Sequence, residues 1–439
     1  MNMSNRWSGY AIDVRTASSS AGVHATSRRI ALAGSLVLVL AWSAFVVAQT
    51  EANAALTEER AILLALERPV IRDLVQGGVG VAEGNLIEAQ TLPNPHFELE
   101  SEQVTGAPAG VIERTARFAQ RFDFSGRRGL RIEAARTRVE VARADGEARR
   151  KELIYDVRRR FHETLALQAT HDALTRWSHR LAEAEQRSAT LQKGGEVAGY
   201  DRRRIARERV TVEARLQALQ ADRARAGESL ATLMGNTLGP AIALEGMLLP
   251  DDPRPLADLL ATVSDRPELR SVALRAESFR REEQAAQRAW IPDVTLGAGI
   301  RHIDAGARTD SGFLLSVSVP LPLFDRGEGP RRRAAAQVEL TVAQLALARE
   351  RAEGDVRGLW MQSRQLNEAA RRFGTEALDA SRRLVQIAEA AYRGGETTIL
   401  ELLDTYRGMA EGDTRAIELA LAARLARLEL DFLSGEPTR

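Results

Sequence analysis

The segment PDVTLGAGIRHIDAGARTDSGFLLSVSVPL, residues 292–321, carries the pattern on which the fold depends. Apolar side chains occupy every second position in two runs, 294–300 and 313–321. Alternation with a period of two is typical of strands, and glycines between the runs favour a turn. The segment therefore predicts two strands, at about 293–302 and 312–321, which follow a helix that ends before Pro292.

An internal repeat extends this pattern to the whole chain, because short motifs recur in the same order about 200 residues later. The matching pairs are Arg68-Pro69 with Arg266-Pro267, Asp156-Val157-Arg158 with Asp355-Val356-Arg357, and Gly194-Gly195-Glu196 with Gly394-Gly395-Glu396. We expect a first repeat over residues 55–235, a linker over 236–258 that contains four prolines, and a second repeat over 259–435.

Each repeat is expected to contain a helix, two strands and a long helical hairpin. In the first repeat the strands are predicted at about 96–103 and 114–124, between a helix over 56–91 and a hairpin of helices 126–193 and 201–234. In the second repeat a helix over 255–290 precedes the strands, and helices 327–393 and 398–433 follow them. Sustained three- and four-residue apolar spacing favours antiparallel coiled coils. The fold class is therefore mainly α with a small β part.

The N-terminal residues 1–54 resemble a secretory signal. Arg28 and Arg29 precede an apolar run over 30–48, and small residues follow it, so cleavage is expected near 48 or 54. The same run is long enough to serve as a membrane anchor instead. In that alternative the protein is a membrane-anchored structural coiled-coil protein.

The predicted strands are about as long as the tilted strands that cross an outer membrane. Four strands cannot close a barrel, and an open sheet edge is not tolerated in lipid. Two copies of the chain would supply about 8 strands with a filled lumen, and three would supply about 12 and a pore. The alternative is a pair of soluble β-hairpins that cap a helical bundle.

Composition excludes several classes of function. The 61 basic and 60 acidic residues give a net charge of +1, which argues against a nucleic-acid partner. There is no cysteine, and none of the six histidines forms an H-x-x-x-H or H-E-x-x-H motif. We therefore expect no enzymatic activity, no cofactor and no metal site.

Three segments carry a family resemblance: LPNPHFELE (92–100), QRFDFSGRRGLRIEAA (120–135) and YRGGETTILELLD (392–404). The chain resembles the TolC family of outer-membrane efflux proteins, and the second segment resembles its heavy-metal branch, of the cobalt-zinc-cadmium type. The resemblance implies a homotrimer in which four transmembrane strands per chain form one 12-stranded barrel. It also implies a periplasmic helical tunnel that docks to an adaptor (membrane fusion) protein and, through it, to an inner-membrane RND pump.

The helix hairpins are expected to reverse at two tips, residues 193–201 and 393–404. Glycine is needed where the chain turns with positive φ, and Thr397 or Thr398 can cap the outgoing helix. The resemblance adds docking to the adaptor, whereas the plainer alternative is that the tips are only well-capped hairpins. The expected docking residues are Gly194, Gly195, Glu196, Gly394, Gly395, Glu396 and Thr398.

An entrance gate is also implied by the resemblance. Glu401 and Asp404 lie three residues apart on one helix face, and in the family an acidic pair there faces the pore. Asp201 and Tyr392 match residues that hold the entrance shut in other members, although Thr397 stands where an arginine is expected. The alternative is a solvated face near a helix N-terminus, where acids are favourable anyway.

The resulting functional hypothesis is a passive export duct in the outer membrane of a Gram-negative bacterium, with its helices in the periplasm. Divalent heavy-metal cations are the expected cargo, and the inner-membrane pump supplies the energy. Drugs or polypeptides secreted by a type I system are the alternative cargo on the same scaffold.

Overall fold

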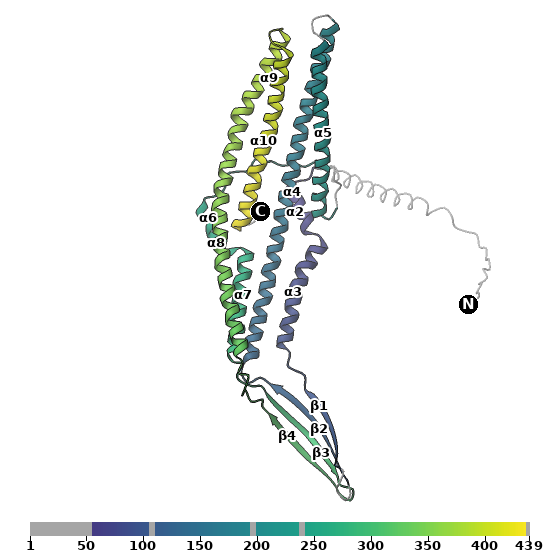
Figure 1. The fold of residues 1–439 in the computed structure, drawn as a ribbon, viewed down its shortest axis with the longest axis vertical. Coiled ribbons are helices and arrows are strands. Elements are labelled where there is room, and N and C mark those ends of the chain that lie inside the picture. The colour runs from purple at the N-terminus through teal and green to yellow at the C-terminus, as the bar shows by residue number, and fades with distance from the viewer. Residues whose placement is uncertain (1–54, 105–109, 194–198, 237–241, 436–439) are drawn as a thin grey trace, which may run out of the picture. The chain divides into compact units, whose positions relative to one another are not determined.

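The computed structural model describes residues 55–104, 110–193, 199–236 and 242–435 (Figure 1). The expected leader, residues 1–54, lies outside these ranges. The described residues from Leu56 onward form one compact unit by their internal contacts. Within the described ranges, no helix combines the length and the apolar character that crossing a membrane requires.

The two halves of the chain contain the same order of elements. The first half contains α2 (Glu58–Leu66), α3 (Pro69–Gln90), β1 (His96–Val104), β2 (Val111–Phe122), α4 (Arg127–Lys193) and α5 (Gly199–Leu233). The second half contains α6 (Leu256–Thr262), the short 3-10 turn η1 (Val263–Asp265), α7 (Pro267–Gln287), β3 (Val294–Asp304), β4 (Thr309–Ser318), α8 (Glu328–Arg372), the π-helical turn η2 (Phe373–Ala377), α9 (Leu378–Arg393) and α10 (Ile399–Ser434).

Two of the expected helices, 56–91 and 255–290, are each broken in the structure, so their prediction as continuous helices was wrong. Pro69 and Pro267 begin new helices, and the preceding Arg68 and Arg266 are extended, with ψ of 127° and 134°. Proline lacks an N–H group and disfavours helical geometry in the residue before it, but it is well placed at the first helical position. The expected helix 327–393 is also not uniform, because the π-helical turn separates α8 from α9.

The strands form one four-stranded sheet in the order β1-β2-β3-β4, with every neighbouring pair antiparallel. Each repeat contributes one hairpin, and β2 pairs with β3 to join them. The register places Phe97 opposite Phe118 and Ile300 opposite Phe313. Strands β1 and β4 are consequently the two edges of this sheet.

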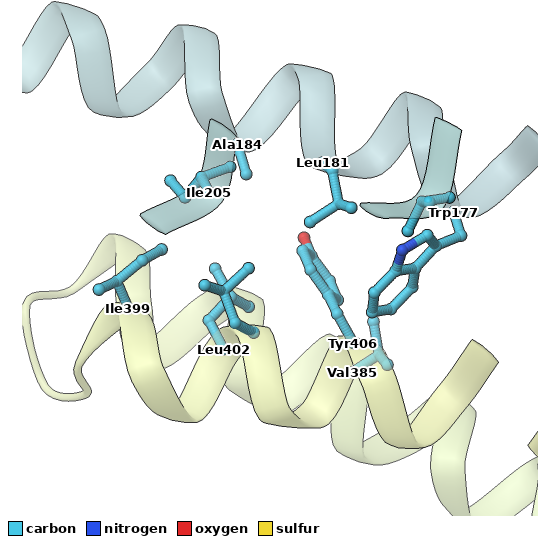
Figure 2. Packing of buried hydrophobic residues seen from close by; sticks show 10 residues of the cluster. Trp177, Leu181, Ala184, Ile205, Val385, Ile399, Leu402 and Tyr406 are labelled. Carbon is cyan, nitrogen blue, oxygen red and sulfur yellow. The ribbon is translucent and has the colours of Figure 1, made fainter. Parts of the chain in front are cut away.

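The helical hairpins α4/α5 and α9/α10 share one apolar core near their turns. Trp177 and Leu181 of α4 and Ile205 of α5 pack with Leu402 and Tyr406 of α10 (Figure 2). The Trp177 and Tyr406 rings meet edge to face, with centroids 5.8 Å apart. Burial of these large side chains is the main favourable contribution to holding the two hairpins together.

The segment between the repeats packs across the helices. The side-chain amide of Gln168 in α4 donates to the Leu244 carbonyl and accepts from the Leu244 N–H, both at 3.0 Å. Arg424 of α10 donates to the carbonyls of Met247, Leu248 and Leu249. Helices from both repeats therefore satisfy the backbone groups of this segment.

A buried ionic cluster fixes α2 onto α4. The carboxylate of Glu58 accepts a hydrogen bond from Arg158 and lies 3.0 Å from Nε2 of His162, whose side chain is almost fully buried. Burial opposes ionisation of Glu58, but the bond to His162 and the charge of Arg158 outweigh it. The pKa of Glu58 therefore falls from 4.5 to about 2.

Glu58→Gln is expected to destabilise the protein at neutral pH but much less in acid. A lowered pKa means that the charged carboxylate stabilises the folded state above about pH 4.5, and this stabilisation, on the order of 3 kcal/mol, is lost as the pH falls toward about 2. The difference in thermal unfolding midpoint between the wild type and Glu58→Gln, followed from pH 7 to pH 2.5, measures this loss of stabilisation. The control is Glu59→Gln, because Glu59 is exposed. A pH-independent difference between Glu58→Gln and the wild type would contradict the assignment.

Candidate functional site

One face of the sheet is apolar and exposed. The register brings Phe97, Phe118, Ile300 and Phe313 onto this face, together with Leu315. Phe313 is 94% exposed and Leu315 is 83% exposed. Among the described residues, no helix packs onto these side chains, so their apolar surface is uncovered by the described helices.

The opposite face of the sheet is charged. Arg117 donates to Glu98 at 3.1 Å, and Arg301 forms an ion pair with Glu113. A cavity on this face is lined by both ion pairs and by Glu100, Glu102, Thr115 and Leu314. The two faces thus suit different media, hydrocarbon on one side and water on the other.

Gly299 lets neighbouring strands approach closely on the charged face. A Cβ atom at this position would lie 2.3 Å from the carbonyl oxygen of Ala116 and 2.9 Å from Cα of Arg117. Any larger residue would force the β2 backbone away. Gly299 therefore allows β2 to lie close to β3. Arg117 of β2 lies opposite Gly299 and pairs with Glu98 of β1.

The tip between α9 and α10 is a hairpin with a capped outgoing helix. Gly395 has φ of +73°, and Thr398 is the N-cap of α10. The Glu401 N–H donates to the Thr398 hydroxyl at 3.4 Å, and the Glu401 carboxylate accepts from the Thr398 N–H at 3.3 Å. This is a capping box, so Glu401 stabilises the start of α10 whatever else it does.

The two acidic residues of the expected gate differ in their surroundings. Both are exposed, but the Glu401 carboxylate turns back toward Thr397 and Thr398. Asp404 lies near Arg407, whose side chain crosses to α5 and pairs with Glu208 at 3.0 Å. The tip of α10 is therefore joined to the first hairpin by an ion pair beside Asp404.

The structure places Asp201 within range for its charge to act on the Tyr392 hydroxyl, and no hydrogen bond joins the two in the described residues. Asp201 lies in the first turn of α5, and Tyr392 lies in the last turn of α9. Burial, and then the negative charge of Asp201, raise the pKa of Tyr392. In the described part of the chain the buried Tyr392 hydroxyl finds no partner. The other tip residues, Gly194, Gly195 and Glu196, lie outside the described residues.

Residues 261–436 match the model of a family described as outer membrane efflux protein. The match covers the second repeat of the chain, which is similar to this family. The chain is 24% identical over 398 residues to the cobalt-zinc-cadmium resistance protein CzcC of Cupriavidus metallidurans, covering 88% of this chain and 91% of the relative. It is 27% identical to the nickel-cobalt-cadmium resistance protein NccC of Alcaligenes xylosoxydans, covering 61% and 62%.

Solved outer-membrane channels share this fold. The outer membrane protein VceC of Vibrio cholerae superposes with a TM-score of 0.70 at 20% identity, covering 86% of this chain and 96% of that one. CusC, a transmembrane channel, superposes with a TM-score of 0.72 at 15% identity, covering 86% and 91%. With the family match, these findings identify an outer-membrane efflux channel and confirm the expected location.

Sequence reasoning missed a polar contact inside the tip core. The Tyr406 hydroxyl donates to Glu389 of α9 at 2.8 Å, and burial raises the pKa of Tyr406 well above its ordinary value. The spacing of Ile399, Leu402 and Tyr406 on one helix face was the available signal. In the described ranges, no group of three His, Asp or Glu residues is arranged to hold a metal ion.

Proposed function

We propose that three copies of this chain form the outer-membrane duct of a tripartite system that exports divalent heavy-metal cations. A periplasmic adaptor would dock to the helix tips, and an inner-membrane RND pump would drive transport. The observation that carries the proposal is the amphipathic sheet, whose apolar face is uncovered and whose edges, β1 and β4, are open.

The sheet supports a shared barrel by its edges and by its faces. In hydrocarbon, unpaired N–H and C=O groups at an edge cost several kcal/mol each, so β4 of one copy must pair with β1 of another. Because the strands of one sheet alternate in direction, this pairing is again antiparallel. Three copies would give about 12 strands, enough for a water-filled pore lined by the charged face.

Adjacent leucines of β4 provide a direct test of which face meets lipid. Leu315 lies on the apolar face, whereas Leu314 lines the charged cavity. Leu315→Arg is expected to cost about 2–4 kcal/mol in the membrane and to reduce the amount of protein in the outer membrane, while Leu314→Arg should be tolerated. Membrane fractionation with immunoblotting measures both. Equal recovery of the two variants would contradict the orientation.

Heavy-metal cargo is supported by the curated relatives and by the charge of the second tip. The names of CzcC and NccC state resistance to cobalt, zinc, nickel and cadmium. In a trimer, Glu401 and Asp404 would place six carboxylates around the entrance, and such a ring favours cations. Asp201 and Tyr392 would narrow the same entrance, because they lie at the ends of α5 and α9 beside the two tips.

Docking to the adaptor is proposed for the same tips. Gly394, Gly395 and Glu396 are exposed at the turn, and the Thr398 cap fixes the direction of α10. Gly194, Gly195 and Glu196 would present the equivalent turn of the first repeat. A partner could contact the exposed turn at residues 394–396 without disturbing the apolar core between the hairpins.

A different cargo on the same scaffold is the second candidate. The pyoverdine export outer membrane protein OpmQ of Pseudomonas putida is 28% identical over 176 residues, covering 38% of this chain and 36% of that protein. The name of this relative states export of pyoverdine, which is an organic molecule and not a metal cation. Growth tests on metals and on organic compounds therefore have to be run side by side.

Expression of the wild-type gene in a deletion strain is expected to restore tolerance to zinc, cobalt and cadmium, but not to dyes. Glu401→Gln with Asp404→Asn should lower metal tolerance, since Gln keeps the capping contact but the ring loses its charge. Glu411→Gln with Glu418→Gln removes two exposed charges elsewhere on α10 and is the control. Restored dye tolerance alone would contradict metal cargo, whereas a fully active gate variant would contradict only the acidic ring.

A further inference from the structure

A belt of large exposed apolar side chains surrounds the junction between the sheet and the helices. Leu321, Leu323 and Phe324 follow β4 and are 73%, 67% and 101% exposed. Phe124 follows β2, and Trp290 precedes β3. Both are also exposed. Aromatic and aliphatic residues at the end of membrane strands are typical of the boundary between hydrocarbon and headgroups.

Four arginines lie directly beyond this belt at the start of α8. Arg326, Arg331, Arg332 and Arg333 are all exposed. None of them has a side-chain hydrogen bond or ion pair within the part of the chain that the structure describes, and only Glu328 is acidic in the first turn of α8. Cations near a helix N-terminus are unfavourable because the helix dipole is positive there. This cluster therefore weakens the helix that carries it.

The same junction in the first repeat uses its arginines differently. Arg127 pairs with Asp293 at 2.6 Å, and Arg128 donates to the carbonyl of Gln90. There the guanidinium groups are satisfied by the protein itself. Among the described residues the α8 arginines have no such partners, so their charge is available to a group outside the described part of the chain.

We propose that Arg331, Arg332 and Arg333, with Arg326, bind the phosphate groups of anionic phospholipids in the periplasmic leaflet of the outer membrane. The inference rests on the proposed function, since it requires the apolar face of the sheet to lie in lipid. The junction joins the strands to the periplasmic helices, so it lies at the inner leaflet, where phospholipid headgroups begin just beyond the apolar belt. Guanidinium groups bind phosphate oxygens in paired hydrogen bonds, and each basic residue at an anionic surface strengthens attachment.

Trp290 gives the interaction an intrinsic reporter. Gly327 is the N-cap of α8, and a Cβ atom there would lie 2.6 Å from Cβ of Ala289. Trp290 is the next residue after Ala289, so it lies near the start of α8. Trp177 and Trp360 belong to α4 and α8 and pack against helices or the linker. The experiment reconstitutes the full protein in vesicles that contain brominated phosphatidylglycerol or brominated phosphatidylcholine and compares quenching of tryptophan fluorescence.

The wild type is expected to prefer brominated phosphatidylglycerol by about tenfold or more. Arg331→Gln with Arg332→Gln and Arg333→Gln should remove this preference. Arg202→Gln with Arg203→Gln and Arg207→Gln, which removes the same charge from exposed positions of α5, should keep it.

The outcomes separate this inference from the proposed function. Equal quenching of the wild type by both lipids, or an unchanged preference in the α8 variant, would overturn the lipid site. Either result would still show that the protein lies in the membrane. Quenching by neither lipid would show that Trp290 is not at a bilayer and would overturn the proposed function itself.

Discussion

The constraint that governs this molecule is that backbone hydrogen-bonding groups need partners wherever water is absent. The described residues of one chain form a four-stranded sheet, with an apolar face exposed to the surroundings and a strand at each edge that lacks a second neighbour. In water the face would drive aggregation, and in lipid the edges would be unsatisfied. The proposed closure with other copies would resolve both problems, because strand pairing would remove the edges and lipid would cover the face.

The helical part supports the sheet by joining the repeats tightly. Trp177 and Tyr406 hold the two hairpins together near the tips, and Gln168 and Arg424 bind the linker across the helices of both repeats. The buried cluster around Glu58 fixes the first helix of the unit to α4. These contacts pack the helices of the two repeats against each other within one chain.

Much of the fold could be read from the sequence because strong periodicities report burial directly. Alternation at Leu296, Ile300 and Leu315 predicted strands, and the order of elements followed from the repeat. The helix breaks at Pro69 and Pro267 were missed because proline at a first helical position leaves the surrounding Ala/Leu spacing intact. A cap at Thr397 or Thr398 was anticipated, and Thr398 is the cap. The Tyr406–Glu389 bond was not anticipated, because helical spacing predicts that Tyr406 is buried but does not identify its partner on another helix.

Disulfide formation across the strand edges tests the shared barrel most directly, because the chain has no cysteine of its own. Cysteine is placed at Leu99 in β1 and, in separate variants, at Phe313, Leu315 or Val317 in β4. Only pairing of β4 with β1 brings such residues within disulfide reach, at Cβ distances of roughly 3.5–4.5 Å. Shared closure predicts that oxidation in the outer membrane produces a covalent trimer for at least one register. Chains that remain single in all three variants would contradict it.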